Sequence, residues 1–313
     1  MTKTEYLSAS DKGIARAATL LRSGGLVAFA TETVYGLGAD AGDDRAVARI
    51  YEAKGRPSFN PLIVHLADTA QARDLVEWPD LAQKTAQAFW PGPLTLVLPL
   101  RKGAPISKLV TAGLDTLAIR IPANKSARAF LRAADRPVAA PSANLSGQIS
   151  PTCAGHVRAG LGGRIEAVLD AGPCEMGLES TIIGFTGVPT LLRPGGVTPE
   201  ALQEVLQVSV PLRKDTDKIS APGQTLSHYA PRARVRLDAH GFAKGEARLG
   251  FGAVDCDLNL SASGDLREAA ANLFAHLHRL DAMGADVIAI SPIPQTGLGL
   301  AINDRLKRAA AER

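Results

Sequence analysis

Apolar runs of strand length, separated by stretches with helical spacing, limit most strongly how this chain can fold. Residues 26–30 and 62–66 have the length and apolar character of buried strands. Ser10-Asp11 is typical of a helix start and Gly24-Gly25 of a helix end. Further strands are expected at 94–98, 116–121, 138–140, 167–169, 181–185 and 190–192, with helices from residue 43 to 55, at 80–89 and at 199–206. This irregular alternation predicts an α/β fold on a mixed sheet.

The chain changes character after residue 206. Residues 211–231 are rich in Pro, Gly, Lys, Asp and Ser, which is typical of a linker. Beyond them, strands at 234–237, 247–251 and 287–290 and helices at 265–280 and 300–311 predict a small Rossmann-like α/β unit. We therefore expect a first domain at 1–206, a linker at 207–231 and a C-terminal domain at 232–313.

Charge and composition exclude several classes of protein. With 35 Lys and Arg, 31 Asp and Glu, and 4% aromatic residues, the chain lacks the broad basic or base-stacking surface of a dedicated nucleic-acid binder. Cys153, Cys174 and Cys256 are too scattered for disulfides or a zinc site, so we expect them to be buried in a reducing compartment, the cytoplasm. The polar N-terminus predicts no signal peptide, and no apolar run is long enough for a membrane span.

Familiar catalytic motifs are missing. The dipeptide Gly-Lys never occurs, which excludes a Walker A loop, and neither G-x-S-x-G nor H-E-x-x-H is present. Polar segments instead follow the predicted strands, at 31–38, 141–144, 179–181 and 193–196. Because ligands bind beyond strand ends in open α/β sheets, we expect these segments to converge on one cavity. Any chemistry there is expected to depend on orientation and charge.

Four cations mark this expected cavity: Lys54, Arg56, Arg120 and Arg193. Together with nearby hydroxyl and amide groups they can hold a polyanion such as a phosphate chain. For Lys54 and Arg56 taken singly, a solvated surface charge or an ion-pair partner is the simpler interpretation. Arg120 differs, because a guanidinium inside an apolar strand needs an anionic or hydrogen-bonding partner. His65, also in an apolar strand, is compatible with either a core or a site position.

Several motifs in a fixed order resemble those of the YrdC/Sua5 family. They are T-E-T-V-Y-G-L-G, K-G-R, N-P-L-I-V-H, P-S-A-N-L-S-G, S-P-T, E-S-T-I and R-P-G, all at predicted strand or helix ends. The later S-H-Y-A-P, at 227–231, is similar to the linker motif of the longer Sua5 branch. Ala30 departs from the proline common before T-E-T, which changes local stiffness.

The resemblance implies a twisted sheet with a basic cavity that makes L-threonylcarbamoyladenylate. The substrates would be L-threonine, bicarbonate or CO2, and ATP, with Mg²⁺ accompanying the nucleotide and pyrophosphate released. The product would pass to proteins that modify adenosine 37 of tRNA, with at most a weak direct contact to tRNA. By resemblance, Lys54 and Arg56 are catalytic, and no protein side chain binds a metal. The implied ATP-binding residues are Arg56, Asn60, Thr116, Ser142, Asn144, Ser150, Arg193 and Tyr229. The implied threonine-binding residues are Thr33, His65, Arg120, Ala140 through its backbone, Ser180 and Thr181.

Three other interpretations compete with this one. A member of the family with a changed substrate is disfavoured by the intact K-x-R and S-x-N positions. An RNA-binding protein using the same basic cavity would show steep salt dependence and no requirement for threonine. A carbamoyl-adenylate domain of the hydrogenase-maturation type would need cysteine-rich zinc modules, which three scattered cysteines do not form. For the linker, we expect a lid that excludes water from a labile adenylate, the alternative being an inert tether.

Overall fold

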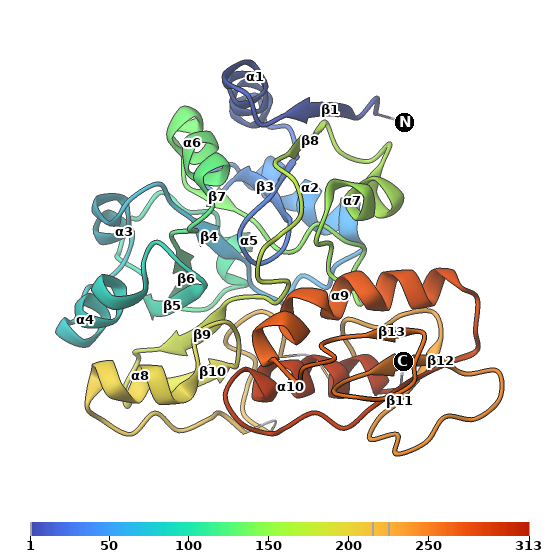
Figure 1. The fold of residues 1–313 in the computed structure, drawn as a ribbon. Coiled ribbons are helices and arrows are strands. Elements are labelled where there is room, and N and C mark those ends of the chain that lie inside the picture. Colours follow the sequence, from blue (N-terminus) through green and yellow to red (C-terminus); the bar gives the residue numbers. More distant parts are fainter. Residues whose placement is uncertain (1, 215, 225, 313) are drawn as a thin grey trace.

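The computed structural model describes residues 2–214, 216–224 and 226–312. Within these residues, two sheets organise the chain (Figure 1): one of ten strands and one of four. The large sheet contains both parallel and antiparallel pairs, for example β2 with β8 and β2 with β3. The predicted mixed α/β fold is therefore confirmed.

The large sheet has the strand order β1-β8-β2-β3-β7-β4-β6-β5-β9-β10. Its strands are β1 (Glu5–Ser8), β2 (Val27–Phe29), β3 (Gly36–Asp40), β4 (Ile63–His65), β5 (Leu94–Pro99), β6 (Thr116–Arg120), β7 (Val138–Ala139), β8 (Ala167–Asp170), β9 (Thr181–Gly184) and β10 (Thr190–Arg193).

The helices around this sheet begin and end at residues with suitable side chains. Ser10 accepts a hydrogen bond from the backbone N–H of Gly13 at the start of α1, and Gly55 ends α2 with a φ of 60°. The helices are α1 (Asp11–Arg22), α2 (Asp44–Lys54), α3 (Thr69–Leu75), α4 (Asp80–Phe89), α5 (Lys108–Thr111), α6 (Lys125–Ala134), α7 (Ala154–Leu161) and α8 (Pro199–Leu206).

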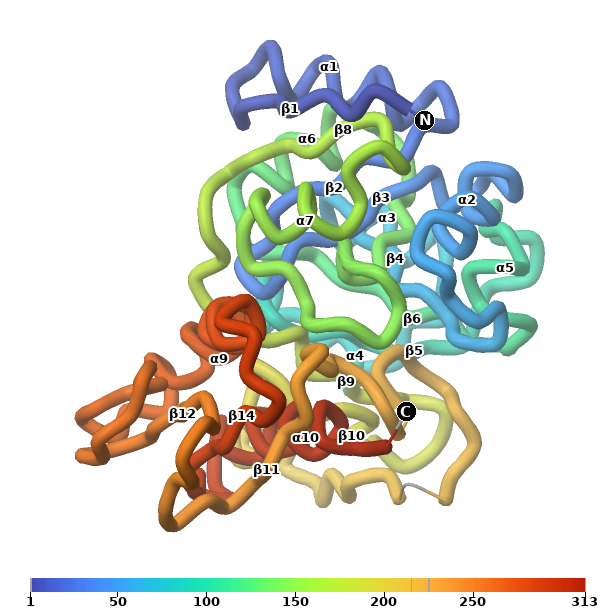
Figure 2. The backbone as a smooth tube through the Cα atoms, turned by 90° about the vertical axis from the view of Figure 1, so that its right-hand side faces the viewer, coloured from blue at the N-terminus to red at the C-terminus, as the bar shows by residue number. Residues whose placement is uncertain are grey.

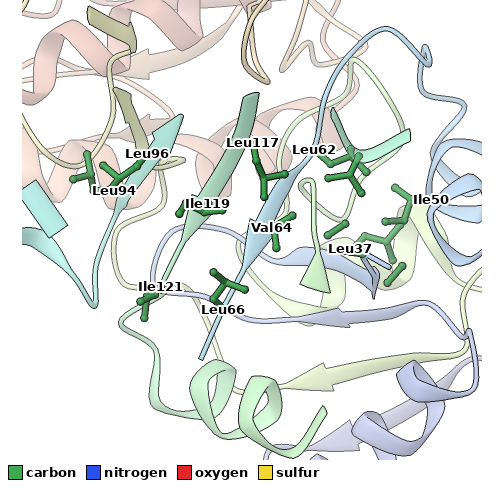
Figure 3. Packing of buried hydrophobic residues seen from close by; sticks show 14 of the residues in the cluster. Leu37, Ile50, Leu62, Val64, Leu66, Leu94, Leu96, Leu117, Ile119 and Ile121 are labelled. Atoms are coloured by element: carbon green, nitrogen blue, oxygen red, sulfur yellow. The ribbon is translucent and has the colours of Figure 1, made fainter. Parts of the chain in front are cut away.

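In β4 and β6, strand register separates the side chains of the central apolar cluster from two polar side chains of the site. Val64 of β4 and Leu96 of β5 both pair with Ile119 of β6, and all three lie in the buried cluster shown in Figure 3. The next pair along, His65 with Arg120, is displaced by one residue and so points to the opposite face. The apolar packing of β4 and β6 therefore fixes where these two side chains lie.

The C-terminal sheet is entirely parallel and has the strand order β11-β14-β12-β13. Its elements are β11 (Arg234–Arg236), β12 (Ala247–Gly250), β13 (Leu258–Asn259), α9 (Leu266–Ala282), β14 (Val287–Ile290) and α10 (Leu298–Ala310). Figures 1 and 2 show α9 where this unit meets the larger one, and Nε2 of His278 lies 3.2 Å from the carbonyl oxygen of Ser150.

Two further expectations can be compared with the fold. Over the described ranges, every helix is too short or too polar to cross a membrane. Of the three cysteines, Cys174 is buried as expected, whereas Cys153 and Cys256 are half-buried. The expectation of full burial was therefore wrong for those two residues, which occupy loops outside the central strands.

Candidate active site

A cavity lies where strand ends of the large sheet meet the linker. The linker contributes Pro222, Gly223, His228 and Tyr229 to the wall. The predicted site residues that line the cavity are Thr33, Arg56, His65, Arg120, Ala140, Ser142, Ser180, Arg193 and Tyr229. The sequence-based expectation that these segments converge on one cavity is met for this set.

Arg56 and Arg193 bring two buried positive charges to the cavity wall. The Nε and Nη2 atoms of Arg56 donate to the carbonyl oxygens of Asn60 and Pro61, at 3.3 and 3.0 Å. Arg193 donates from Nε and Nη2 to the carbonyl oxygen of Ser180, at 3.1 and 2.9 Å. Burial, together with the charge of Arg193, lowers the pKa of Arg56 to about 10. Two desolvated cations facing one cavity are an arrangement that an anionic ligand would stabilise.

Arg120 pairs with a residue that sequence reasoning omitted from the site. Its Nη2 lies 2.5 Å from Oε1 of Glu32, its Nη1 donates to Oγ1 of Thr33 at 2.9 Å, and its Nε donates to the carbonyl oxygen of Gly92. The buried guanidinium thus has the anionic partner that its apolar strand requires, but that partner belongs to the protein. The charge of Arg120 alone therefore does not demand a ligand, although the side chain still lines the cavity.

Lys54 lies behind the cavity rather than in its wall. Its Nζ donates to the carbonyl oxygens of Ser142 and Asn144, holding the loop that follows β7. Burial and the charge of Arg56 lower the pKa of Lys54 well below its usual value. The surface position considered for Lys54 and Arg56 is wrong, because both side chains are buried. In this arrangement the ammonium group of Lys54 positions the loop that carries Ser142.

Five further predicted site residues do not line the cavity: Asn60, Thr116, Asn144, Ser150 and Thr181. Thr116 begins β6, at the opposite end of the strand from Arg120. The hydroxyl of Thr181 donates to the carbonyl oxygen of Val197 at 2.6 Å, and that of Ser150 donates to Oε1 of Glu179 at 2.5 Å. The backbone carbonyl oxygen of Asn60 accepts a hydrogen bond from Nε of Arg56.

Several cavity residues hold buried polar atoms without a hydrogen-bond partner among the described residues. These are Nδ1 of His65, Nδ1 of His228 and the hydroxyl of Tyr229. Burial lowers the pKa of both histidines to about 3, so their rings are neutral at physiological pH. Because buried polar groups are normally paired, these atoms indicate places where a ligand can bind.

Glu179 connects the cavity to the C-terminal unit. It lines the cavity, accepts the Ser150 hydroxyl at Oε1, and accepts Nε of Arg305 at Oε2, at 2.8 Å. Arg305 belongs to α10 and is fully buried. Its position between Ile302 and Leu306 on the buried stripe of α10 was the sequence signal that could have identified it.

The described residues contain no group of three His, Cys, Asp or Glu side chains able to hold a metal ion. The carboxylate of Glu179 has both oxygens engaged, and so does that of Glu32, which also accepts the backbone N–H groups of Ala123 and Asn124. These carboxylates therefore do not fit a protein-held Mg²⁺ site.

Comparisons with known proteins agree with this architecture. The family model Sua5/YciO/YrdC, described as "Telomere recombination", matches residues 19–195, and the model described as "Threonylcarbamoyl-AMP synthase, C-terminal domain" matches residues 197–311.

Relatives match over nearly the whole length. The threonylcarbamoyl-AMP synthase of Bacillus subtilis is 44% identical, over 99% of this chain and 96% of the relative. That of Pyrococcus abyssi is 43% identical, over 95% and 94%. The crystal structure of P. abyssi Sua5 complexed with L-threonine has a TM-score of 0.90 and 40% identity, covering 99% of this chain and 98% of that one. This chain therefore belongs to the Sua5/YciO/YrdC family, in its longer form that carries the Sua5 C-terminal domain.

Proposed function

We propose that this chain is an L-threonylcarbamoyladenylate synthase, a nucleotidyltransferase that uses L-threonine, bicarbonate or CO2, and ATP. The observation that carries the proposal is the cavity lined by Arg56, Arg120 and Arg193, in a chain whose full-length relatives bear this name. The product supplies N6-threonylcarbamoylation of adenosine 37 in tRNA through downstream transfer proteins. A reaction that consumes ATP and serves tRNA belongs in the cytoplasm.

The proposed chemistry requires no protein nucleophile. The amine of threonine adds to CO2 and loses a proton, giving an N-carboxylate. One carboxylate oxygen then attacks the α-phosphorus of ATP; a new P–O bond forms, the bond to the β-phosphate oxygen breaks, and pyrophosphate leaves. The protein must bring two anions together, which buried cations favour by orientation and by preorganised charge. Mg²⁺ enters as part of the nucleotide substrate, held by phosphate oxygens.

Two regions of the site take different substrates in this proposal. Paired His65 and Arg120, with Thr33 bonded to Arg120, form a compact group suited to a small amino acid. The complex of the P. abyssi relative with L-threonine supports an amino-acid site in this fold. Arg56, Arg193 and Tyr229 bind the nucleotide, and Lys54 acts indirectly by holding the loop that carries Ser142. The remaining predicted residues complete these regions: Ala140 and Ser180, with Thr181, for threonine; Asn60, Thr116, Asn144 and Ser150 for ATP.

The linker acts as a lid in this proposal. Residues 222, 223, 228 and 229 line the cavity, and Nη1 of Arg193 donates to the carbonyl oxygen of Pro222 at 3.4 Å. In this proposal the linker, which forms part of the cavity wall, moves when a nucleotide enters, and its return excludes water from the adenylate. Contact between the linker and Arg193 is not expected of an inert tether. The cations of this cavity are buried rather than spread over the surface, which favours small substrates over an RNA backbone.

Pyrophosphate release by the full-length chain tests the proposal. With ATP and bicarbonate present, release is expected with L-threonine and to fall strongly with L-valine, which lacks the hydroxyl. L-serine measures the contribution of the methyl group. The reaction product is identified by mass as threonylcarbamoyl-AMP. Equal rates with all three amino acids, or pyrophosphate release without any amino acid, would contradict the assignment. A chain that binds tRNA and releases no pyrophosphate would favour the RNA-binding alternative.

A further inference from the structure

The C-terminal unit contributes one fully buried charged side chain to the rear of the cavity. Arg305 of α10 has no solvent exposure. Its Nε donates to Glu179 at 2.8 Å, and its Nη1 donates to Asp304 at 2.7 Å. Its guanidinium carbon lies 5.3 Å from the centre of the Tyr229 ring, which belongs to the linker. One side chain thus contacts the first unit and the linker from the third part of the molecule.

Burying an arginine is unfavourable unless hydrogen bonds and charge pairs offset the loss of its hydration. Asp304 is already bonded to Nε of Arg308 at 3.0 Å, so α10 could satisfy its acidic group without Arg305. The contact that distinguishes Arg305 is Glu179, a carboxylate in the wall of a cavity that otherwise displays cations. A negative charge there would repel a triphosphate if nothing balanced it.

We propose that Arg305 is a positioning residue for the nucleotide, which neutralises Glu179 and keeps its carboxylate on Ser150 and away from Arg193. This inference rests on the proposed use of the cavity for ATP. Arg193 is the next available cation, because it donates to the carbonyl oxygen of Ser180, the residue after Glu179, and both side chains line the cavity. In agreement, Arg305 and then Arg193 lower the pKa of Glu179 against the effect of burial. Without Arg305, Glu179 turns toward Arg193 and competes with the phosphates for it. The guanidinium of Arg305 also packs against the ring of Tyr229 and holds that ring in place.

The threonine region should not respond to this change. Arg120 has its own carboxylate, Glu32, at 2.5 Å, and within the described part of the chain no hydrogen bond joins that pair to Glu179. Loss of Arg305 is therefore expected to affect ATP and threonine differently. A residue that only stabilised the fold would weaken both ligands together.

Calorimetric titration of the full-length chain with ATP, and separately with L-threonine, tests the proposal. Arg305→Met is expected to weaken ATP binding by about tenfold or more, the scale of breaking a buried charge pair, and to leave threonine binding within about twofold. Adding Glu179→Gln removes the competing carboxylate, so the double variant R305M/E179Q is expected to recover ATP binding to within about threefold of wild type. Arg232→Met is the matched control, because Arg232 belongs to the same unit, pairs with Asp281 and has an exposed side chain.

Each outcome decides the question. ATP binding by R305M that equals wild type overturns the proposal, and so does equal weakening of ATP and threonine without rescue by E179Q. If R305M does not fold, R305M/E179Q still decides, because tight ATP binding supports the proposal and weak binding overturns it. Titration measures binding without turnover. A wild-type chain that binds ATP but forms no adenylate would therefore refute the proposed function and leave this test intact.

Discussion

The guanidinium of Arg120 pairs with Glu32 and also lines the cavity. A single substitution of Arg120 is therefore expected to change both the stability of the fold and the binding of a ligand. Arg120→Ala is expected to lower the free energy of unfolding by about 3–5 kcal/mol, since it leaves a buried carboxylate unpaired. It is also expected to abolish threonine binding. Urea unfolding and calorimetric titration measure the two effects separately.

A double variant separates the two tasks of Arg120. R120A/E32Q is expected to recover most of the lost stability, because no unpaired charge remains, while threonine binding stays at least about tenfold weaker. Arg49→Ala is the control: the Arg49–Glu166 pair is partly exposed, so its loss is expected to change stability by at most about 1 kcal/mol and threonine binding not at all. Threonine binding by the double variant at wild-type affinity would show that Arg120 is structural only.

Among the elements, the linker permits a prediction in which stability and binding change in opposite directions. The Tyr229 hydroxyl is buried and has no partner among the described residues. Tyr229→Phe should therefore keep or raise the free energy of unfolding, by up to about 1–3 kcal/mol. ATP binding should weaken by about tenfold, since the hydroxyl is expected to bond the nucleotide.

Tyr35→Phe is the matched control for Tyr229→Phe, because it removes a buried tyrosine hydroxyl outside the linker. The Tyr35 hydroxyl donates to the carbonyl oxygen of Gly172 at 2.7 Å, so its loss is expected to reduce stability by about 1 kcal/mol without affecting ATP. Unfolding by urea and titration with ATP compare the two variants. A Tyr229→Phe chain that loses stability and binds ATP normally would mean that the linker tyrosine only packs.

The elements that sequence could predict are those with strong local patterns. The expected helices at 80–89 and 199–206 match α4 and α8 in both bounds. β3 was not predicted, because Gly36-Leu37-Gly38 has little strand preference by itself. It forms because a Cβ at Gly38 would lie only 2.9 Å from Val138, so glycine allows β3 to approach its neighbours closely. The strands β1 and β13 and the helices α3, α5, α6 and α7 were missed as well.

In the candidate site, too, local sequence patterns predicted some features and not others. Strand ends and cations were visible in the sequence, and the cavity brings Arg56, Arg120 and Arg193 together. The partners of those cations were not visible, because Glu32 lies 88 residues from Arg120 in sequence, and Arg305 lies 126 residues from Glu179. Such pairs follow from the topology of the two sheets rather than from any local motif.

At the scale of the whole molecule, buried histidines connect stability to pH. His65 in β4 and His228 in the linker each have a pKa lowered to about 3 by burial, and His156 of α7 has one lowered to about 4 by burial and by the charge of His278, on which it stacks. The unfolded value is about 6.5, so the unfolded chain binds more protons between these limits. The free energy of unfolding should therefore fall as pH falls below about 6.5, by about 2 kcal/mol per histidine between pH 7 and pH 5.

Carboxylates with a lowered pKa, such as that of Glu179, contribute little in this interval, because their stability is lost only as pH falls through the unfolded value of about 4.3 and below. Urea unfolding at pH 7 and at pH 5 measures the loss. His65→Phe keeps a ring beside Phe29 but cannot titrate, so it is expected to reduce the difference between the two pH values by about 2 kcal/mol. His240→Gln, at an exposed position, should leave the difference unchanged. If His65→Phe retained the full wild-type difference, His65 would have to be charged in the folded protein, and the neutral, ligand-accepting ring assigned to it would be wrong.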